Sequence, residues 1–102
     1  MAVPQELVRD AIDERRIVRL RYQGDGSERE VWPHIMYRTS KGTVCVDCYQ
    51  IAGPTHGRLP DWRPFNLMKI VTFDAEQWRF EVAPDYNSAS PKYRYGVLAR
   101  VR

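Results

Sequence analysis

Short strand-like runs separated by turn residues fill most of this 102-residue chain and constrain its fold more than any other feature. Residues 17–23 alternate apolar and polar side chains, as a half-buried strand does. Residues 28–34 form a second run, which Pro33 is expected to end, because proline has no N–H to donate to a central ladder. Residues 43–51 are the most strand-like run. This succession predicts a small, curled antiparallel sheet or barrel.

The segment ahead of these runs has the pattern of one amphipathic helix, over residues 4–16. Pro4 suits the first helical turn, while Arg15 and Arg16 complement the negative end of the helix dipole. One face of this helix carries the apolar residues Leu7, Val8, Ala11 and Ile12. Because that face is only two turns long, the helix is expected to cover one end or one face of the sheet.

A basic and aromatic run at residues 61–70 follows a glycine- and proline-containing loop. If the whole run is a strand, its alternation puts four residues on one face, namely Arg63, Phe65, Leu67 and Lys69. The aliphatic parts of the arginine and lysine side chains on such a face can cover apolar atoms, while their charged groups are offered to an anion or a stacked base. The alternative is a half-exposed strand whose basic residues are merely solvated.

The last third of the chain is less regular. Asp74 and Gln77 resemble an N-cap and its partner three residues later, which predicts a short helix. Trp78 and Phe80 are expected to plug the end of the core. After an irregular connection, residues 93–102 read as a last basic, aromatic strand.

Composition and charge favour one ordinary globular domain spanning residues 1–102. The chain is 43% hydrophobic and 28% charged, with 16 basic and 13 acidic residues, so its formal net charge is +3. This excess of positive charge is compatible with an anionic partner but does not require one. No apolar run is long enough to span a bilayer, and the first residues do not resemble a signal peptide, so a cytoplasmic protein without membrane attachment is expected.

The two cysteines, Cys45 and Cys48, form a single Cys-x-x-Cys within the most strand-like run. An odd separation along a strand sends the two thiols to opposite faces. A zinc site would also need two more ligands, and only His34 and His56 remain as candidates. We therefore expect reduced packing residues, with no metal and no cofactor.

Five stretches, taken in order, resemble the WYL domain, a module of bacterial transcriptional regulators and of regulators of CRISPR and phage-defence systems. The opening helix leading into residues 18–22 resembles the family's start, and residues 29–34 resemble its R-x-V-x-P strand. Residues 42–49 occupy the place of the name-giving strand, and residues 61–70 resemble the W-R-x-F-x-L-x-x-I signature. The tail of the family is matched by Asp85-Tyr86-Asn87 together with Tyr93.

Two departures from the family pattern affect binding chemistry. The Trp-Tyr-Leu tripeptide is replaced by Val44-Cys45-Val46, so that strand loses its aromatic contribution. Lys69 stands where the family usually has arginine, and lysine lacks the planar fork that grips a phosphate with two bonds.

The resemblance implies a mainly β fold (α+β by count), with an N-terminal helix followed by a small Sm-like, SH3-type antiparallel barrel of about five strands. It also implies a non-catalytic regulatory domain of transcription or defence that binds single-stranded nucleic acid or a nucleotide. Arg63 and Lys69 would meet phosphates. The other predicted site residues are the stacking candidates Phe65, Tyr22, Tyr37 and Tyr49, the polar His34, and Arg21. Alternatively, Tyr22 and Phe65 belong to the core, and His34 bonds only a backbone group.

Two other function classes stay open. A protein-interaction or oligomerisation module would pair through an exposed barrel edge, as a homodimer or with a separate helix-turn-helix protein. An enzyme is the weakest reading. The closest set of acid-base residues, His34, Asp47 and Cys45, would depend on how the strands pair.

Overall fold

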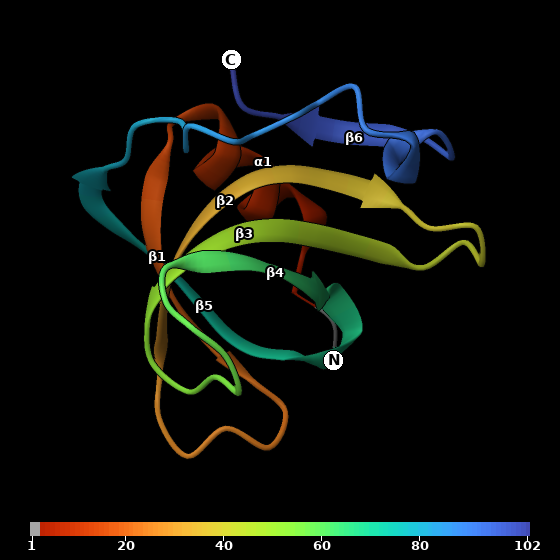
Figure 1. Cartoon of the computed structure of the whole chain (residues 1–102). Coiled ribbons are helices and arrows are strands. Elements are labelled where there is room, and N and C mark those ends of the chain that lie inside the picture. The colour runs from red at the N-terminus through yellow and green to blue at the C-terminus, as the bar shows by residue number, and fades with distance from the viewer. Residues whose placement is uncertain (1–2) are drawn as a thin grey trace.

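One N-terminal helix and a six-stranded antiparallel sheet make up the described part of the chain, residues 3–102 of a computed structural model (Figure 1). The helix is α1 (Gln5–Asp13). The strands are β1 (Arg16–Tyr22), β2 (Arg29–Arg38), β3 (Val44–Ala52), β4 (Asp61–Asn66), β5 (Ile70–Arg79) and β6 (Val97–Arg100). Short 3-10 turns, η1 (Leu67–Lys69) and η2 (Pro91–Tyr93), precede β5 and β6. The predicted mainly β architecture behind one helix is confirmed.

β2 is the strand around which the sheet is ordered. The hydrogen-bonded path runs β4-β3-β2-β1-β5, and β6 also pairs with β2. The first half of β2 pairs with β1, with Val31 opposite Val18, and the second half pairs with β6, with Ile35 opposite Arg100. β3 accompanies β2 along nearly its whole length. One side of β2 therefore serves two different neighbours in succession.

Pro33 lies inside β2 rather than ending it, which corrects the sequence prediction. It stands opposite Cys48 of β3, and the register shifts between Pro33 and Ile35. On the other side of β2, the pairing with β1 stops at Val31 and the pairing with β6 starts at Ile35. The missing N–H of proline thus falls at an irregular point between two neighbouring strands, where the ladder tolerates it.

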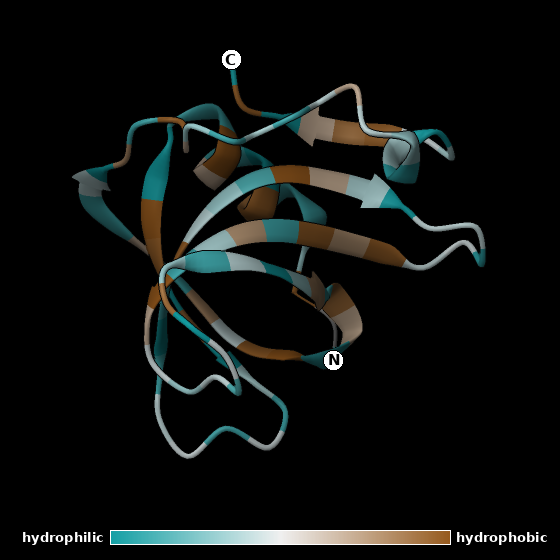
Figure 2. Cartoon of the chain, viewed as in Figure 1, coloured by the Kyte–Doolittle hydropathy of each residue, from teal (hydrophilic) through white to brown (hydrophobic). Residues whose placement is uncertain are grey.

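The main core lies between the sheet and α1. Val8, Ala11 and Ile12 of α1 are buried against it, which confirms that the helix covers the sheet, whereas Leu7 is 43% exposed. Figure 2 shows apolar segments along the strands and on the helix, and mostly polar connecting loops. The helix is shorter than predicted, because Arg15 adopts a positive φ of 53° and its carbonyl accepts a bond of 2.8 Å from the amide of Phe80.

The helix predicted from Asp74 is absent, since these residues belong to β5. Asp74 pairs with Arg19 of β1, and Arg19 also forms an ion pair of 2.6 Å with Glu76. Six register positions with β1 outweigh a local cap pattern, as tertiary pairing commonly does. Phe80 is buried as expected, but Trp78 is 62% exposed and does not plug the core.

The run at 61–70 alternates only as far as Asn66. There the Asn66 side chain accepts a bond of 2.9 Å from the amide of Met68 and starts η1, so Lys69 leaves the face that carries Phe65. At the far end of the chain, Tyr93 belongs to η2 and the last strand is confined to β6. Within residues 3–102, no helix has the length and apolar character needed to cross a membrane.

Candidate anion-binding site

Two loops at one end of the sheet enclose a cavity of about 470 Å³. Residues 23–28 connect β1 to β2, residues 53–60 connect β3 to β4, and both loops lie at the bottom of the view in Figure 1. The lining residues are Gly24, Asp25, Gly26, Arg29, Pro54, Thr55, His56, Gly57 and Arg63. Two arginines therefore contribute to the wall of one cavity.

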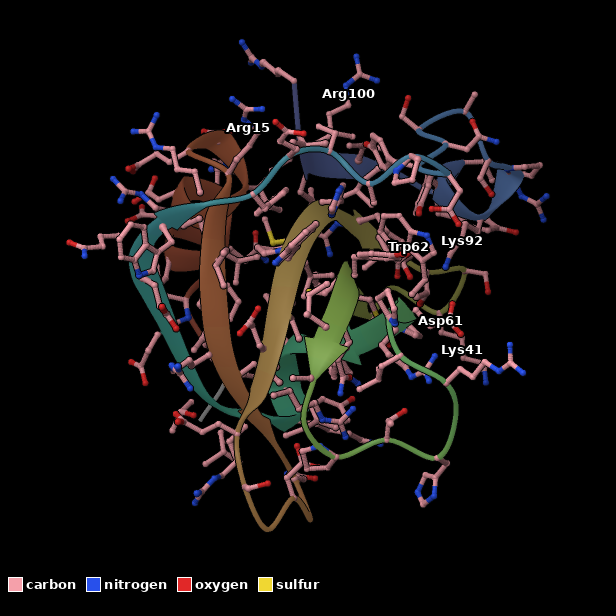
Figure 3. The ribbon with its side chains drawn as sticks, turned by 60° about the vertical axis from the view of Figure 1, so that its left-hand side comes forward. Arg15, Lys41, Asp61, Trp62, Lys92 and Arg100 are labelled. Atoms are coloured by element: carbon pink, nitrogen blue, oxygen red, sulfur yellow. The ribbon has the colours of Figure 1, made fainter. Side chains whose placement is uncertain are left out.

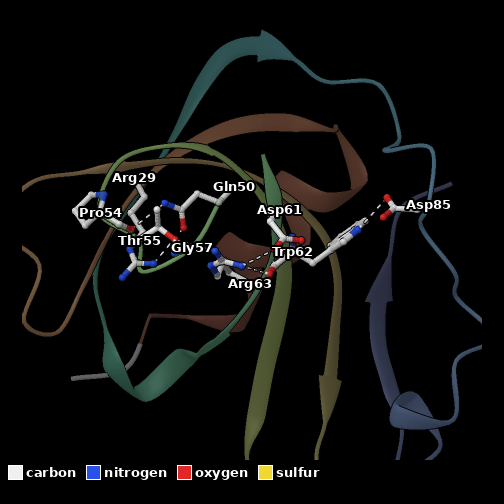
Figure 4. Close-up of polar contacts among 9 residues, drawn as sticks. All are labelled: Arg29, Gln50, Pro54, Thr55, Gly57, Asp61, Trp62, Arg63 and Asp85. Atoms are coloured by element: carbon white, nitrogen blue, oxygen red, sulfur yellow. Dashed lines mark hydrogen bonds and ion pairs between the residues drawn. The ribbon is translucent and has the colours of Figure 1, made fainter. Parts of the chain in front are cut away.

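Arg63 reaches this cavity from β4. Its Nη2 donates to the Thr55 hydroxyl at 2.8 Å, and its Nη1 donates to the Trp62 carbonyl at 2.9 Å and to Asp61 at 3.1 Å (Figure 4). The Asp61 side chain is 56% exposed, and a single exposed ion pair of this kind contributes little free energy. An incoming anion can therefore replace Asp61 at low cost.

Gly57 packs directly against the Arg63 guanidinium. A Cβ at this position would lie 2.9 Å from Arg63 Nη2, which is closer than real Cβ contacts. The absence of a side chain at Gly57 thus lets the loop close over the guanidinium and hold it at the cavity wall.

Arg29 is the fixed cation of the cavity. Its guanidinium donates two bonds to Asp25, at 2.8 and 2.9 Å, and a third of 3.1 Å to Gln50. The bond from Arg29 holds the pKa of the Asp25 carboxyl below its usual range, so this pair stays ionised. The guanidinium also lies 5.2 Å from the centre of the Phe65 ring. Arg29 is thus largely neutralised and shapes the wall, which leaves Arg63 as the more exchangeable cation.

The cavity can hold a single phosphate-sized anion. Arg63 supplies charge and a planar donor fork, and the Thr55 hydroxyl lies beside it. Gly24 and Gly26 also line the cavity, and the space beside them is open, because a Cβ at either position would meet nothing within 4 Å. His56 and Gly57 complete the rim.

Of the eight residues predicted to bind a ligand, Arg63 lines this cavity and the other seven do not. Tyr22 and Phe65 are structural, which corrects their assignment as stacking faces. Phe65 is 1% exposed, the two rings meet edge to face at 5.1 Å, and the Tyr22 hydroxyl accepts a bond of 3.0 Å from the amide of Asn66. The alternative that placed both in the core holds for Phe65, and Tyr22 packs against that core.

His34 is buried and fully bonded, so it is not the polar edge of a site. Its Nε2 accepts from the Ala83 amide at 3.0 Å, which leaves the proton on Nδ1 to donate to the Trp32 carbonyl at 2.8 Å. Burial lowers the pKa of His34, so the ring is held neutral. The alternative that His34 bonds backbone groups is the correct one.

Tyr37 is also buried, and its hydroxyl donates to Asp47 at 2.7 Å. This contact belongs to a second, smaller apolar cluster on the sheet face opposite the main core. Cys45 packs against this cluster and Cys48 lies in the main core, so the two thiols occupy opposite faces as predicted. Burial raises the pKa of both thiols.

Tyr49 lies on the face of the sheet that Arg63 does not share. Tyr49 pairs with Trp62, and their rings lie 5.3 Å apart, whereas Arg63 pairs with Cys48 of the main core. Figure 4 shows Trp62 directed toward Asp85 and Arg63 directed toward Thr55 and Gly57. The side chains of Arg63 and Trp62 therefore diverge, because successive residues of a strand point to opposite faces.

Arg21 and Lys69 are exposed and lie outside the cavity lining. The residues that sequence reasoning missed are Arg29, Thr55 and His56. In the sequence, these residues could be found only as basic or hydroxyl residues within or beside the two glycine-containing loops at 23–28 and 53–60. The pairing of the strands, which the sequence does not show, brings those two loops together.

No group of three or more metal-binding side chains occurs among residues 3–102. Comparisons with protein-family models, with curated proteins and with solved structures found no match to this chain.

Proposed function

We propose that this chain is a non-catalytic regulatory module that binds a phosphate-bearing ligand, single-stranded nucleic acid or a nucleotide, in the cavity between residues 23–28 and 53–60. The observation that carries the proposal is the position of Arg63. Its guanidinium lies at the wall of a 470 Å³ cavity, and the carboxylate that it contacts is exposed.

Binding by this cavity would be electrostatic and tolerant of base sequence. One exchangeable arginine can replace about one counterion, so the logarithm of the affinity should fall with the logarithm of salt concentration with a slope near −0.7 to −0.9. Phosphate contacts position a ligand without reading its bases. The rings of Tyr22, Tyr37 and Phe65 already pack against other aromatic rings within the fold, which supports contact with phosphate rather than stacking of bases.

The finer fold assignment is also a proposal, namely a partly open Sm-like or SH3-type barrel. β4 and β5 form the two ends of the hydrogen-bonded path, yet they follow one another in the chain and are joined by η1. This connection favours a curled sheet, as does the resemblance to the WYL domain in five ordered stretches. That resemblance also supports a role in transcription or defence.

A binding role fits the acid-base residues better than catalysis does. Both nitrogens of His34 are used within the fold, and the Asp47 carboxylate accepts bonds from two tyrosine hydroxyls. Neither residue has the free proton-transfer position that a general acid or base needs.

The proposal is tested by fluorescence anisotropy with labelled oligothymidylate and a labelled nucleotide, at about 50 and 200 mM salt. Arg63→Gln should weaken binding of at least one probe roughly tenfold, which corresponds to one charge-assisted bond. Arg79→Gln, which removes an equal charge from β5, should change affinity less than about twofold. Equal effects of the two variants, or affinity independent of salt, would remove this cavity as the site.

A further inference from the structure

β6 has one edge that carries no strand in the described part of the chain. It pairs with β2 alone, and α1 lies beside it (Figure 1). Unpaired edges present rows of N–H and C=O groups that can take up another chain. The position of α1 limits this edge to a groove rather than a flat, open border.

The groove between α1 and β6 is a cavity of about 540 Å³. Its lining residues are Arg9, Asp13, Val97, Leu98, Ala99, Arg100 and Arg102. Within residues 3–102, none of its three arginines has a carboxylate within 4.0 Å, although Arg16, Arg19, Arg29 and Arg63 all do. Figure 3 shows Arg100 projecting from the same end of the molecule as Arg15. With three arginines against the single carboxylate of Asp13, the lining of this groove therefore carries net positive charge.

The backbone of β6 offers hydrogen-bonding groups to this groove. The amide of Val101 donates to the His34 carbonyl at 2.8 Å, on the β2 side. Because alternate residues of a strand direct their polar groups to opposite sides, Arg100 and Leu98 direct theirs to the free edge. The Leu98 carbonyl confirms this direction, because it accepts a long bond of 3.4 Å from Arg9 Nη2.

The geometry points to a docking site for an extended, acidic peptide segment of a partner protein, added to β6 as a further antiparallel or parallel strand. A peptide N–H would take the Leu98 carbonyl from Arg9 and free the Arg9 guanidinium. Carboxylates at alternate positions of the peptide would then pair with Arg9, Arg100 and Arg102. Val97, which is 41% exposed, would contact an apolar side chain between them.

A peptide fits this groove better than a nucleic acid strand does. A phosphodiester backbone carries acceptors and no N–H donors, so it cannot form the ladder of backbone hydrogen bonds that the edge of β6, with its Leu98 carbonyl, offers. A second copy of this chain is also disfavoured, because two arginine-lined edges would face each other and repel. The occupant is therefore identified by two properties together, negative charge and a backbone that can both donate and accept.

The test uses the unaltered protein, three fluorescent peptides and one unlabelled competitor. The first is an eight-residue peptide of alternating Glu and Val, and the second replaces Glu with Lys. The third is the Glu-Val peptide with N-methyl groups on alternate residues, which keeps its charge and removes donors on one edge. The competitor is oligothymidylate of equal charge. Anisotropy titrations should show the Glu-Val peptide binding at least about tenfold tighter than the other two peptides, and an excess of unlabelled oligothymidylate, whose proposed site is the Arg63 cavity, should not displace it.

Variants then locate the site. The double variant Arg9→Gln, Arg100→Gln should weaken the Glu-Val peptide at least about tenfold, while Arg79→Gln changes its affinity less than about twofold. Absence of binding, equal binding of the N-methylated peptide, or displacement of the Glu-Val peptide by oligothymidylate would each overturn the inference. Because the N-methylated probe requires no mutation, the result does not depend on whether the double variant folds.

Discussion

The hydroxyl of Tyr93 donates a bond of 2.7 Å to Asp47, although 46 positions separate the two residues. Tyr37 donates to the other oxygen of the same carboxylate, Oδ1, at 2.7 Å. Lys92 Nζ lies 2.7 Å from Oδ2, the oxygen that Tyr93 contacts. This carboxylate therefore ties η2, and the irregular segment before it, to β3. The contact also positions β6, which begins four residues after Tyr93.

Tyr93→Phe should destabilise the fold by about 1.5–3 kcal/mol, because it removes a hydrogen bond to a buried charged group. Urea denaturation measures this free energy of unfolding. Tyr95→Phe is the matched control, since the Tyr95 side chain is exposed and its hydroxyl only accepts a bond from neighbouring Arg94. The control should change stability by less than about 0.5 kcal/mol. Similar values for the two variants would show that the Asp47 contact is not a structural tie.

His34 should make the fold lose stability as the pH falls below about 6.5. Burial lowers its pKa in the folded chain, although the Trp32 carbonyl and the Asp85 carboxylate oppose this shift. As the pH falls, the unfolded chain therefore binds a proton at His34 before the folded chain does. The contribution of neutral His34 to the free energy of unfolding is complete above pH 6.5 and declines below it, by at most about 1.4 kcal/mol per pH unit.

Urea denaturation at intervals between pH 7.5 and 5 tests this sign. His34→Gln should lower stability at all pH values and flatten the decline between pH 6.5 and 5. If the variant and the natural chain declined in parallel, another group would be responsible and His34 would titrate normally.

Substitution by alanine should destabilise the fold at Gly53 but not at Gly26. A Cβ at Gly53 would lie 2.6 Å from the Glu28 carbonyl oxygen and 2.7 Å from the Cα of Arg29, and its φ is +104°. Gly53→Ala should therefore destabilise by at least about 2 kcal/mol. Gly26→Ala meets no atom within 4 Å and should be neutral or stabilising by up to about 1 kcal/mol. Thermal melting of both variants decides this, and equal melting temperatures would contradict it.

Gly57→Ala should separate ligand binding from stability. The new methyl group would displace Arg63 Nη2, which is the mobile end of a long side chain, and Gly57 has no positive φ to strain. We expect a stability change within about 0.5 kcal/mol and a several-fold loss of oligothymidylate or nucleotide affinity. Unchanged affinity in a folded variant would show that the Arg63 position is irrelevant to binding.

The existence of the helix and of the first three strands, though not the ends of the helix and of β2, could be predicted from the sequence, as could the opposite facing of the two thiols, because period and turn residues are local properties. Prediction from the sequence failed where residues distant in the chain determine the secondary structure. Asp74 has a good N-cap pattern, yet β1 pairs with it, and Pro33 is tolerated because the neighbouring strand changes beside it.

The binding site was less predictable for a related reason. Arg63 and Trp62 are adjacent in sequence, but strand geometry sends them to opposite faces, so residues close in a motif do not share a site. Arg29 and Thr55 come together with Arg63 only because β2 pairs with β3 and β3 pairs with β4. His34 was misassigned because a buried histidine and a ligand-binding histidine look alike in sequence.

An NMR titration of the isotope-labelled protein with inorganic pyrophosphate, followed by 5′-phosphorylated oligothymidylate, determines whether phosphate binds beside Arg63. If the phosphate binds in the cavity between residues 23–28 and 53–60, the largest shift changes fall on the amides of Gly24, Gly26 and Gly57 and on the Arg63 side chain. Shift changes confined to the Tyr49 and Trp62 face, or to the groove of Arg9 and Arg100, would contradict it, as would no change at any of these sites.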